Sequence, residues 1–343
     1  MGTYIVRRLL QAIPTFLGIT IIAFLVMHYA PGDPIELLTF NPTRGDPEAT
    51  EILRRKLGLD QPPLLQYVYW LVGNDWARVD SNGDGEVDSF GERRGLLRGD
   101  LGQSLKHRRP VGELILEKVP ATLLLTFSAL IVGYGLGILF GILAAVYHKS
   151  WIDQLIRIFT VIGNAMPQFW LGLMLIILLS VRFDILPMSG MRDITQRNAG
   201  FSLWQTARHM IMPVFVLSFG TIAFISRFTR TELLEVLGQD YVRTARSKGI
   251  ANRRIWWNHS LPNALIPVAT FIGPALGTLL AGAVIVEKVF NWPGMGRLIV
   301  DAVFNRDYPL VMGGVVIASA MFIVGLLISD ILYTMLDPRI RLK

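Results

Sequence analysis

Six stretches of this chain are apolar enough and long enough to cross a lipid bilayer as helices. Each offers about the 20 residues that a helix needs to cross roughly 30 Å of hydrocarbon, where every backbone polar group must be paired. With 52% hydrophobic and 17% charged residues in 343, the chain is also too apolar for an ordinary soluble domain. We therefore predict an all-α polytopic membrane protein with six transmembrane helices, at about 9–30, 121–147, 157–182, 208–227, 264–287 and 310–336.

The distribution of basic residues predicts the orientation. Arg7 and Arg8 precede the first span and no small-residue cleavage site follows it, so we expect an uncleaved signal anchor. With the amino terminus inside, about 14 Lys and Arg fall on the cytoplasmic side and about six in the two short outer loops. Both termini are thus predicted to be cytoplasmic. The same bias explains the net charge of +7, so we expect no nucleic-acid partner.

This layout predicts four parts of the chain. They are a tail with the first transmembrane helix (1–30), an extracytoplasmic cap between spans 1 and 2 (31–118) with an acidic insertion at about 73–98, a five-helix core (119–336) and a cytoplasmic tail (337–343). The core includes a cytoplasmic loop at 228–263. The absence of cysteine rules out disulfides, thiolate metal sites and cysteine catalysis.

The cytoplasmic loop is longer and more basic than a simple reversal requires, since about 35 residues separate its flanking spans. We expect Asp240 to cap a first short helix through its carboxylate, and Gly249 to end that helix in the left-handed conformation. Asn252 is expected to cap a second helix and Pro262 to mark its limit. Such a loop can be gripped by a soluble partner, or it can lie as an amphipathic helix on anionic lipid.

Small and polar residues mark special positions inside the spans. Small residues at four-residue spacing predict close helix packing, or else close approach of a substrate to backbone; they are Gly133, Gly137 and Gly141 in the second span and Gly273, Gly277 and Ala281 in the fifth. In the third span Asn164, Pro167 and Gln168 predict a kink, which serves packing or faces a pore.

Ionisable residues deep in the spans are nearly missing, which speaks against a secondary carrier or channel that works alone, as does the lack of an inverted repeat. Asp330 is the main exception, and we expect it to hold neighbouring helices by hydrogen bonds rather than to carry protons.

The outer acidic stretch has the pattern of a calcium-binding loop. Oxygen donors fall at relative positions 1, 3, 5 and 9, with a backbone carbonyl at 7 and Gly85 at the sharp turn. Gly91 replaces the bidentate acid at position 12, and Glu92 follows one residue late. A solvated acidic turn is the alternative. The candidate ligands are Asp80, Asn82, Asp84, Glu86, Asp88 and Glu92.

Several motifs along nearly the whole chain resemble those of bacterial ATP-binding-cassette (ABC) importer permeases of the dipeptide, oligopeptide and nickel branch. They are Pro31-Gly32-Asp33-Pro34, Leu57-Gly58-Leu59-Asp60-Gln61-Pro62, Gly99-Asp100-Leu101-Gly102-Gln103-Ser104, Pro120-Ala121-Thr122, the segment 240–249, Asn263-Ala264, Phe290-Asn291-Trp292-Pro293-Gly294-Met295-Gly296-Arg297 and Arg306-Asp307-Tyr308-Pro309. The long loop after the first span is similar to that of the first (B-type) permease subunit of such importers.

This resemblance implies a type I ABC importer permease fold in the plasma (inner) membrane of a prokaryote. It implies a subunit that forms half of a translocation path for peptides and works by alternating access. The implied partners are a second homologous permease subunit, two ATPase subunits, an extracytoplasmic substrate-binding protein and membrane lipid. The implied coupling residues, which would dock on the ATPase, are Asp240, Tyr241, Val242, Arg243, Ala245, Arg246, Lys248 and Gly249.

The chain itself is not expected to be an enzyme. No Gly-x-x-x-x-Gly-Lys-Ser/Thr phosphate loop occurs in the sequence, so we expect no ATP bound by this chain. Gly102-Gln103-Ser104, with His107 nearby, resembles only a fragment of a serine-hydrolase motif. Similar permeases carry nickel, glutathione or oligosaccharides, so these cargoes remain alternatives to peptides.

Overall fold

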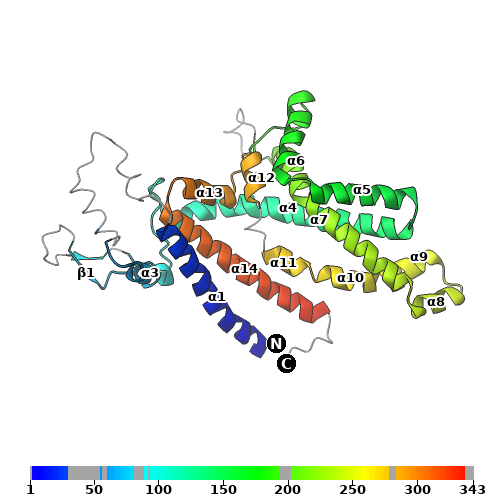
Figure 1. The fold of residues 1–343 in the computed structure, drawn as a ribbon, viewed down its shortest axis with the longest axis horizontal. Helices are drawn as coiled ribbons and strands as arrows, with labels where there is room; N and C mark the ends of the chain where they lie inside the picture. The colour runs from blue at the N-terminus through cyan, green and yellow to red at the C-terminus, as the bar shows by residue number, and fades with distance from the viewer. Residues whose placement is uncertain are drawn as a thin grey trace. The chain divides into compact units, whose positions relative to one another are not determined.

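The computed structural model describes residues 2–29, 55, 60–80, 89–91, 93–192, 202–277 and 283–336. These residues are mostly helical (Figure 1). The chain forms two compact units, and it passes between them within helices α4, α13 and α14. Unit 1 comprises Met1–Val119 and Leu298–Ala320, and unit 2 comprises Pro120–Arg297 and Met321–Lys343.

Unit 1 is built around two long helices and one short helix. Its core consists of Trp70, Met312 and Val316, against which partly buried residues of α1 and α3 pack. Its elements are α1 (Gly2–His28), α3 (Pro63–Val72), β1 (Arg78–Val79), β2 (Ser89–Phe90), the 3-10 helix η1 (Leu96–Arg98), and parts of α4 (Val111–Val146), α13 (Met295–Phe304) and α14 (Tyr308–Leu336).

The two short strands pair antiparallel, with Arg78 opposite Phe90. This pairing brings together the two chain ends that flank the acidic stretch predicted to bind calcium. Of its candidate ligands only Asp80 is described, and its carboxylate lies 3.6 Å from the guanidinium of Arg55. Asn82, Asp84, Glu86, Asp88 and Glu92 lie outside the described residues, so the calcium site stays a prediction.

Unit 2 contains the rest of α4 and α14 and most of the remaining helices. A buried cluster at its centre joins residues of α4, α6, α7 and α12, including Leu125, Phe219 and Phe290. Its other elements are α5 (Trp151–Ala165), α6 (Gln168–Leu175), the π-helix η2 (Ile176–Arg182), α7 (Leu203–Leu237), α8 (Asp240–Ser247), α9 (Asn252–Arg254), the π-helix η4 (Ile255–Ser260), α10 (Leu261–Ala269), α11 (Ile272–Gly277) and α12 (Val284–Val289).

Four helices of the described chain are long and apolar enough to cross a membrane: Val6–His28, Val111–Val146, Leu203–Leu237 and Tyr308–Ser329. A fifth span results if the bent pair of α5 with α6 and η2 is one crossing. The predicted span 264–287 is divided among α10, α11 and α12, and residues 278–282 between them are not described. The structure thus bears out a helical membrane protein with four to five apolar spans among its described residues.

The kink predicted in the third span is confirmed. The chain bends by 107° between α5 and the helical stretch formed by α6 and η2. The backbone of Met166 is extended, as expected for a residue that precedes proline, and Pro167 then stands before α6. Asn164 and Gln168 are exposed. Their predicted role in a pore stays a prediction.

The glycines of the second span form a close packing surface toward α7, as predicted. A Cβ atom on Gly137 would lie 2.8 Å from Cβ of Ile225, and one on Gly141 would lie 2.5 Å from Cβ of Thr229. In the fifth span, Gly277 faces Phe322 of α14. Ala281 lies outside the described residues. The spacing of these glycines therefore reports backbone-to-side-chain contact between helices.

Candidate functional site

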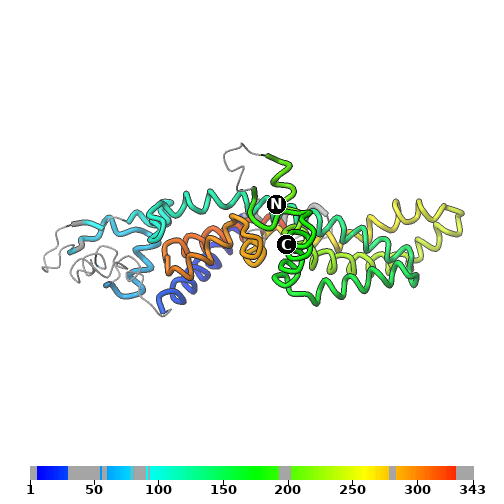
Figure 2. The backbone as a smooth tube through the Cα atoms, turned by 90° about the horizontal axis from the view of Figure 1, so that it is seen from above, coloured from blue at the N-terminus to red at the C-terminus, as the bar shows by residue number. Residues whose placement is uncertain are grey.

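The candidate site is the coupling segment, which we define as residues 238–263. It follows α7 directly and consists of α8, a turn at Gly249, α9, η4 and the start of α10. Figures 1 and 2 show it at one end of unit 2, the same end as the turn between α4 and α5. Gly249 has φ +73°, so the predicted left-handed end of the first short helix is confirmed.

Three details predicted for this segment are wrong. Gln239, and not Asp240, precedes α8, and no side chain caps that helix; the Asp240 carboxylate instead lies 3.4 Å from the Arg243 guanidinium. Ala251 likewise takes the position predicted for Asn252. Pro262 does not end the helical run, because it lies in the first turn of α10, which follows η4 directly.

One face of α8 packs against the chain itself. Val242 is fully buried and Ala245 is 9% exposed, and both pack with the buried side chain of Ile255 in η4. Their spacing of three residues places them on one side of the helix. These two predicted coupling residues therefore hold α8 against η4, and they do not offer the open, small face that docking on a partner requires.

The remaining predicted coupling residues are exposed. The hydroxyl of Tyr241 accepts a hydrogen bond of 3.1 Å from Nδ2 of Asn263, which also donates to the carbonyl of His259 at 3.0 Å. This contact fastens α8 to α10 at the outer edge of the segment. The other exposed members are Asp240, Arg243, Arg246, Lys248 and Gly249, joined by Arg253 and Arg254, so the open surface is mainly basic.

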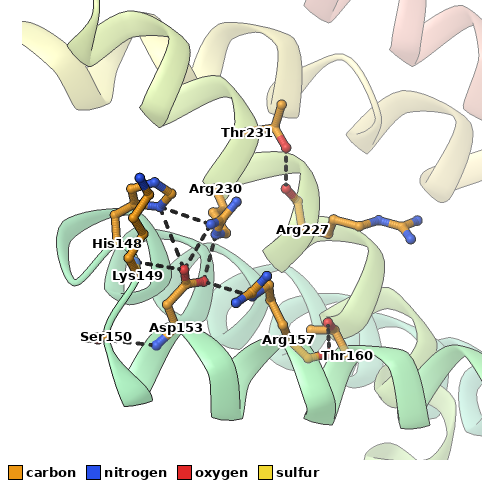
Figure 3. A network of polar contacts seen from close by, with 9 residues as sticks. All are labelled: His148, Lys149, Ser150, Asp153, Arg157, Thr160, Arg227, Arg230 and Thr231. Atoms are coloured by element: carbon orange, nitrogen blue, oxygen red, sulfur yellow. Dashed lines mark hydrogen bonds and ion pairs between the residues drawn. The ribbon is translucent and has the colours of Figure 1, made fainter.

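An ion pair with a buried carboxylate lies beside the turn between α4 and α5 (Figure 3). Asp153 of α5 is 1% exposed in its side chain, and Arg230 of α7 donates to both of its oxygens, from Nε at 2.8 Å and from Nη2 at 2.9 Å. The backbone N–H of Lys149 donates to the same carboxylate at 3.1 Å. Two-point contact by a guanidinium fixes the angle between the groups as well as their distance.

Weaker contacts surround this pair. His148 Nδ1 lies 3.0 Å from Nη2 of Arg230 and 3.7 Å from the Asp153 carboxylate. The exposed Arg157 approaches the same carboxylate at 3.5 Å, whereas the side chain of Arg227 points away from it (Figure 3). Sequence reasoning missed this site. The available signal was Ser150, which caps α5 three residues before Asp153, a pattern typical of a helix start.

A second buried carboxylate belongs to Glu287 of α12, the last residue of the predicted span 264–287. It has no exposed surface. Its oxygens accept hydrogen bonds from the hydroxyl of Thr122 at 2.7 Å and from the backbone N–H of Arg297 at 2.8 Å, while the Thr122 hydroxyl accepts from the N–H of Met295 at 2.7 Å. A side chain on Gly294 would collide with this carboxylate. Two sequence motifs far apart in the chain thus meet at one buried acid.

The serine motif fragment has a structural role. Ser104 is 2% exposed, and its hydroxyl donates to Asp307, which also accepts from the backbone N–H groups of Leu105 and Lys106. His107 contacts Ser104 through its backbone N–H. The hydroxyl hydrogen is therefore directed to a buried carboxylate, in a network that joins two loops of unit 1.

Two family models match this chain. One is described as the binding-protein-dependent transport system inner membrane component and matches residues 137–342. The other describes the N-terminal part of such membrane components and matches residues 1–126. Together they cover both ends of the chain and all the predicted spans, apart from a short stretch within α4.

Curated relatives match over the full length. The oligopeptide transport system permease protein AppB of Bacillus subtilis is 40% identical over 346 residues, which cover 99% of this chain and 100% of the relative. The dipeptide transport system permease protein DppB of Escherichia coli K12 is 41% identical, with both chains covered completely. The glutathione transport system permease protein GsiC of the same strain is 37% identical, again with complete coverage. The chain therefore belongs to the binding-protein-dependent transport system inner membrane components, the permeases of ABC importers, and is a multi-pass inner membrane protein.

Proposed function

We propose that this chain is one of two permease subunits of an ATP-driven importer that carries peptides by alternating access. Family membership supports the transport role, and the two relatives named for oligopeptide and dipeptide transport support the cargo. The structural observation on which the proposal rests is the coupling segment. It is packed around its own buried cluster, follows the long helix α7 and has a basic exposed surface.

The exposed face of α8 is proposed to dock on an ATPase subunit. Arg243, Arg246 and Lys248 can pair with acidic groups at the rim of a cleft. Because Val242 and Ala245 are packed against Ile255, a push on α8 moves the whole segment as one body rather than peeling the helix away. The assembly we propose has two ATPase subunits, this chain, a second permease and an extracytoplasmic binding protein, with both termini of this chain in the cytoplasm.

From the segment, displacement is proposed to reach the bent α5–α6 pair through α7. Arg230 lies seven residues before the end of α7 and holds Asp153 at the start of α5. A helix transmits a displacement along its axis with little loss. The two-point ion pair between Arg230 and Asp153 would then transmit the displacement of α7 to α5. The bend beside Pro167 is then the place where α5 and α6 can change their angle.

Charge reversal on the exposed face tests the docking proposal. Arg246→Glu, in the complex reconstituted in vesicles, is expected to lower ATP-dependent uptake severalfold, and Gly249→Arg to separate ATP hydrolysis from uptake. Arg227→Glu makes the same charge change on an exposed residue of α7 outside the segment, and it should leave docking unchanged. Normal uptake by both segment variants would contradict the proposal.

Glutathione is the second candidate cargo, because GsiC is 37% identical over the whole chain; nickel and oligosaccharides remain further alternatives. Vesicles that hold the complete importer should hydrolyse ATP faster when the binding protein and a short peptide are both present. Stimulation by glutathione and not by di- or oligopeptides would assign the chain to the glutathione transporters instead. Transport by the isolated chain without ATPase subunits would favour a secondary carrier.

A further inference from the structure

Helix α3 carries an apolar stripe that no described part of the chain covers. Leu64, Val68 and Val72 recur every four residues and so lie along one side of the helix. They are 78%, 39% and 37% exposed, whereas Trp70 on another side is buried in the core of unit 1. The ten residues of α3 include no charged side chain. The side of α3 that the described part of the chain leaves open is therefore apolar and uncharged.

The contacts of α3 fix its level along α1. The hydroxyl of Tyr67 lies 2.9 Å from Oγ1 of Thr20, and the rings of Tyr67 and Phe24 meet edge to face at 5.5 Å. Thr20 lies eight residues before His28, the end of the apolar span of α1, or about 12 Å along the helix. A tyrosine side chain is shorter than this distance, so α3 lies beside the span and not beyond its end (Figure 1).

The surface of α1 near this level is apolar and is not covered by the described part of the chain. Ile22 and Val26 are each 64% exposed, and only 6% of the most apolar window of the helix is buried. The stripe on α3 is a second uncovered apolar surface, and it lies on a helix whose Tyr67 contacts α1 at Thr20 and Phe24. Beyond α3 the chain changes character: Trp76 is 56% exposed and packs edge to face on Tyr69, as aromatic residues do at a membrane interface.

From these contacts we infer that α3 is an interfacial helix, embedded beside α1 with its Leu64–Val68–Val72 stripe against lipid acyl chains. Next to Trp76 in the chain, Asp75 forms an exposed ion pair with Arg98. An apolar stripe that is followed by an exposed aromatic residue and an exposed ion pair is typical of the change from acyl chains to the membrane interface. The segment after the first span is thus anchored in the bilayer and does not stand free of it.

The natural absence of cysteine makes a direct test possible, because one introduced cysteine gives one labelling site in the chain. Val68→Cys and Leu64→Cys would each carry a nitroxide in the full chain, assembled with cysteine-free partner subunits in vesicles of phosphatidylethanolamine and phosphatidylglycerol. Collisions with oxygen, which concentrates in lipid, and with a water-soluble nickel chelate are then measured. Ile22→Cys on α1 is the lipid reference, and His107→Cys, at an exposed loop position, is the water reference.

Both α3 labels are expected to resemble the Ile22 label, with higher accessibility to oxygen than to the nickel chelate. Labels that resemble the His107 label would place the stripe in water and overturn the inference. Labels shielded from both reagents would show that a protein surface covers α3, either another part of this chain or a partner subunit, and would overturn it equally. Repeating the measurement on the chain alone in the same vesicles separates these two sources of cover.

Discussion

Arg230 grips both oxygens of the buried Asp153 carboxylate, at 2.8 and 2.9 Å, and thereby joins helices α7 and α5. The partners are 77 positions apart in the chain. Because Asp153 is 1% exposed, its charge depends on this guanidinium and on the Lys149 N–H for compensation. The contact between α7 and α5 at this pair therefore depends on the presence of both charges.

Removing one charge of this ion pair should lower the free energy of unfolding. Asp153→Asn is expected to destabilise the protein by about 3 kcal/mol, since it leaves the Arg230 charge without its partner. It should also reduce ATP-dependent uptake, if α7 drives α5 as proposed. Thermal unfolding in detergent and uptake in vesicles measure the two effects.

The matched control for this variant is Arg157→Gln. Arg157 is 55% exposed and lies 3.5 Å from the same carboxylate, so its loss should cost no more than about 1 kcal/mol. Equal unfolding temperatures for the two variants would show that the contact of Asp153 with Arg230 contributes no more to stability than its contact with Arg157.

The contact between α4 and α7 at their glycines should leave no room for even a methyl group. Gly141→Ala would place its Cβ 2.5 Å from Cβ of Thr229 and 2.7 Å from the carbonyl oxygen of Ser226, so we expect a loss of about 1–3 kcal/mol from overpacking. Gly135→Ala on the same helix meets nothing within 4 Å and should be neutral or slightly stabilising. Comparison of their unfolding temperatures provides the measurement, and similar values would mean that α4 and α7 do not pack at this distance.

The Glu287 site should respond to loss of one hydroxyl. Thr122→Val removes the donor to Glu287 and the acceptor for the Met295 N–H, which leaves buried polar groups unpaired. A cost of about 1–3 kcal/mol is expected, whereas Thr122→Ser retains the hydroxyl and should cost less. A double-mutant cycle of Thr122→Val with Glu287→Gln should show coupling between the two sites. Strict additivity in that cycle would rule out the contact.

The acidic outer stretch remains the place to test for calcium. Calorimetry of the purified protein with millimolar calcium should show weak binding, with a dissociation constant of about 10⁻⁴–10⁻³ M. Asp84→Ala should remove the heat, while Asp60→Ala, an exposed acid outside the stretch, should not. If calcium gives no heat, or if the two variants behave alike, the stretch is an ordinary acidic turn.

The features that sequence could predict are those written in local spacing. Hydropathy located the long helices, Pro167 located the bend, and glycines four residues apart located the seam. Gly249 was found because few residues other than glycine adopt a left-handed backbone. Each of these signals acts within a few residues of its cause, so it survives without knowledge of the rest of the fold.

Features that depend on distant parts of the chain were missed. The sequence near Val242 does not show that Ile255 packs against it. Without that contact, a face of α8 buried within the chain cannot be distinguished from a face open to a partner. Asp153 and Arg230, and likewise Thr122 and Glu287, are brought together by tertiary packing alone. The errors at Asp240 and Asn252 are smaller, since each was a choice between two adjacent residues at a helix start.

The length of α7 has a mechanical consequence. Its 35 residues extend about 50 Å, and the ten that follow Arg227 carry the chain about 15 Å past the end of its predicted span. In the arrangement that we propose, the basic surface of the coupling segment therefore lies beyond the lipid headgroups. A soluble ATPase subunit of the proposed importer would then reach this chain, and move it, without contact with the bilayer.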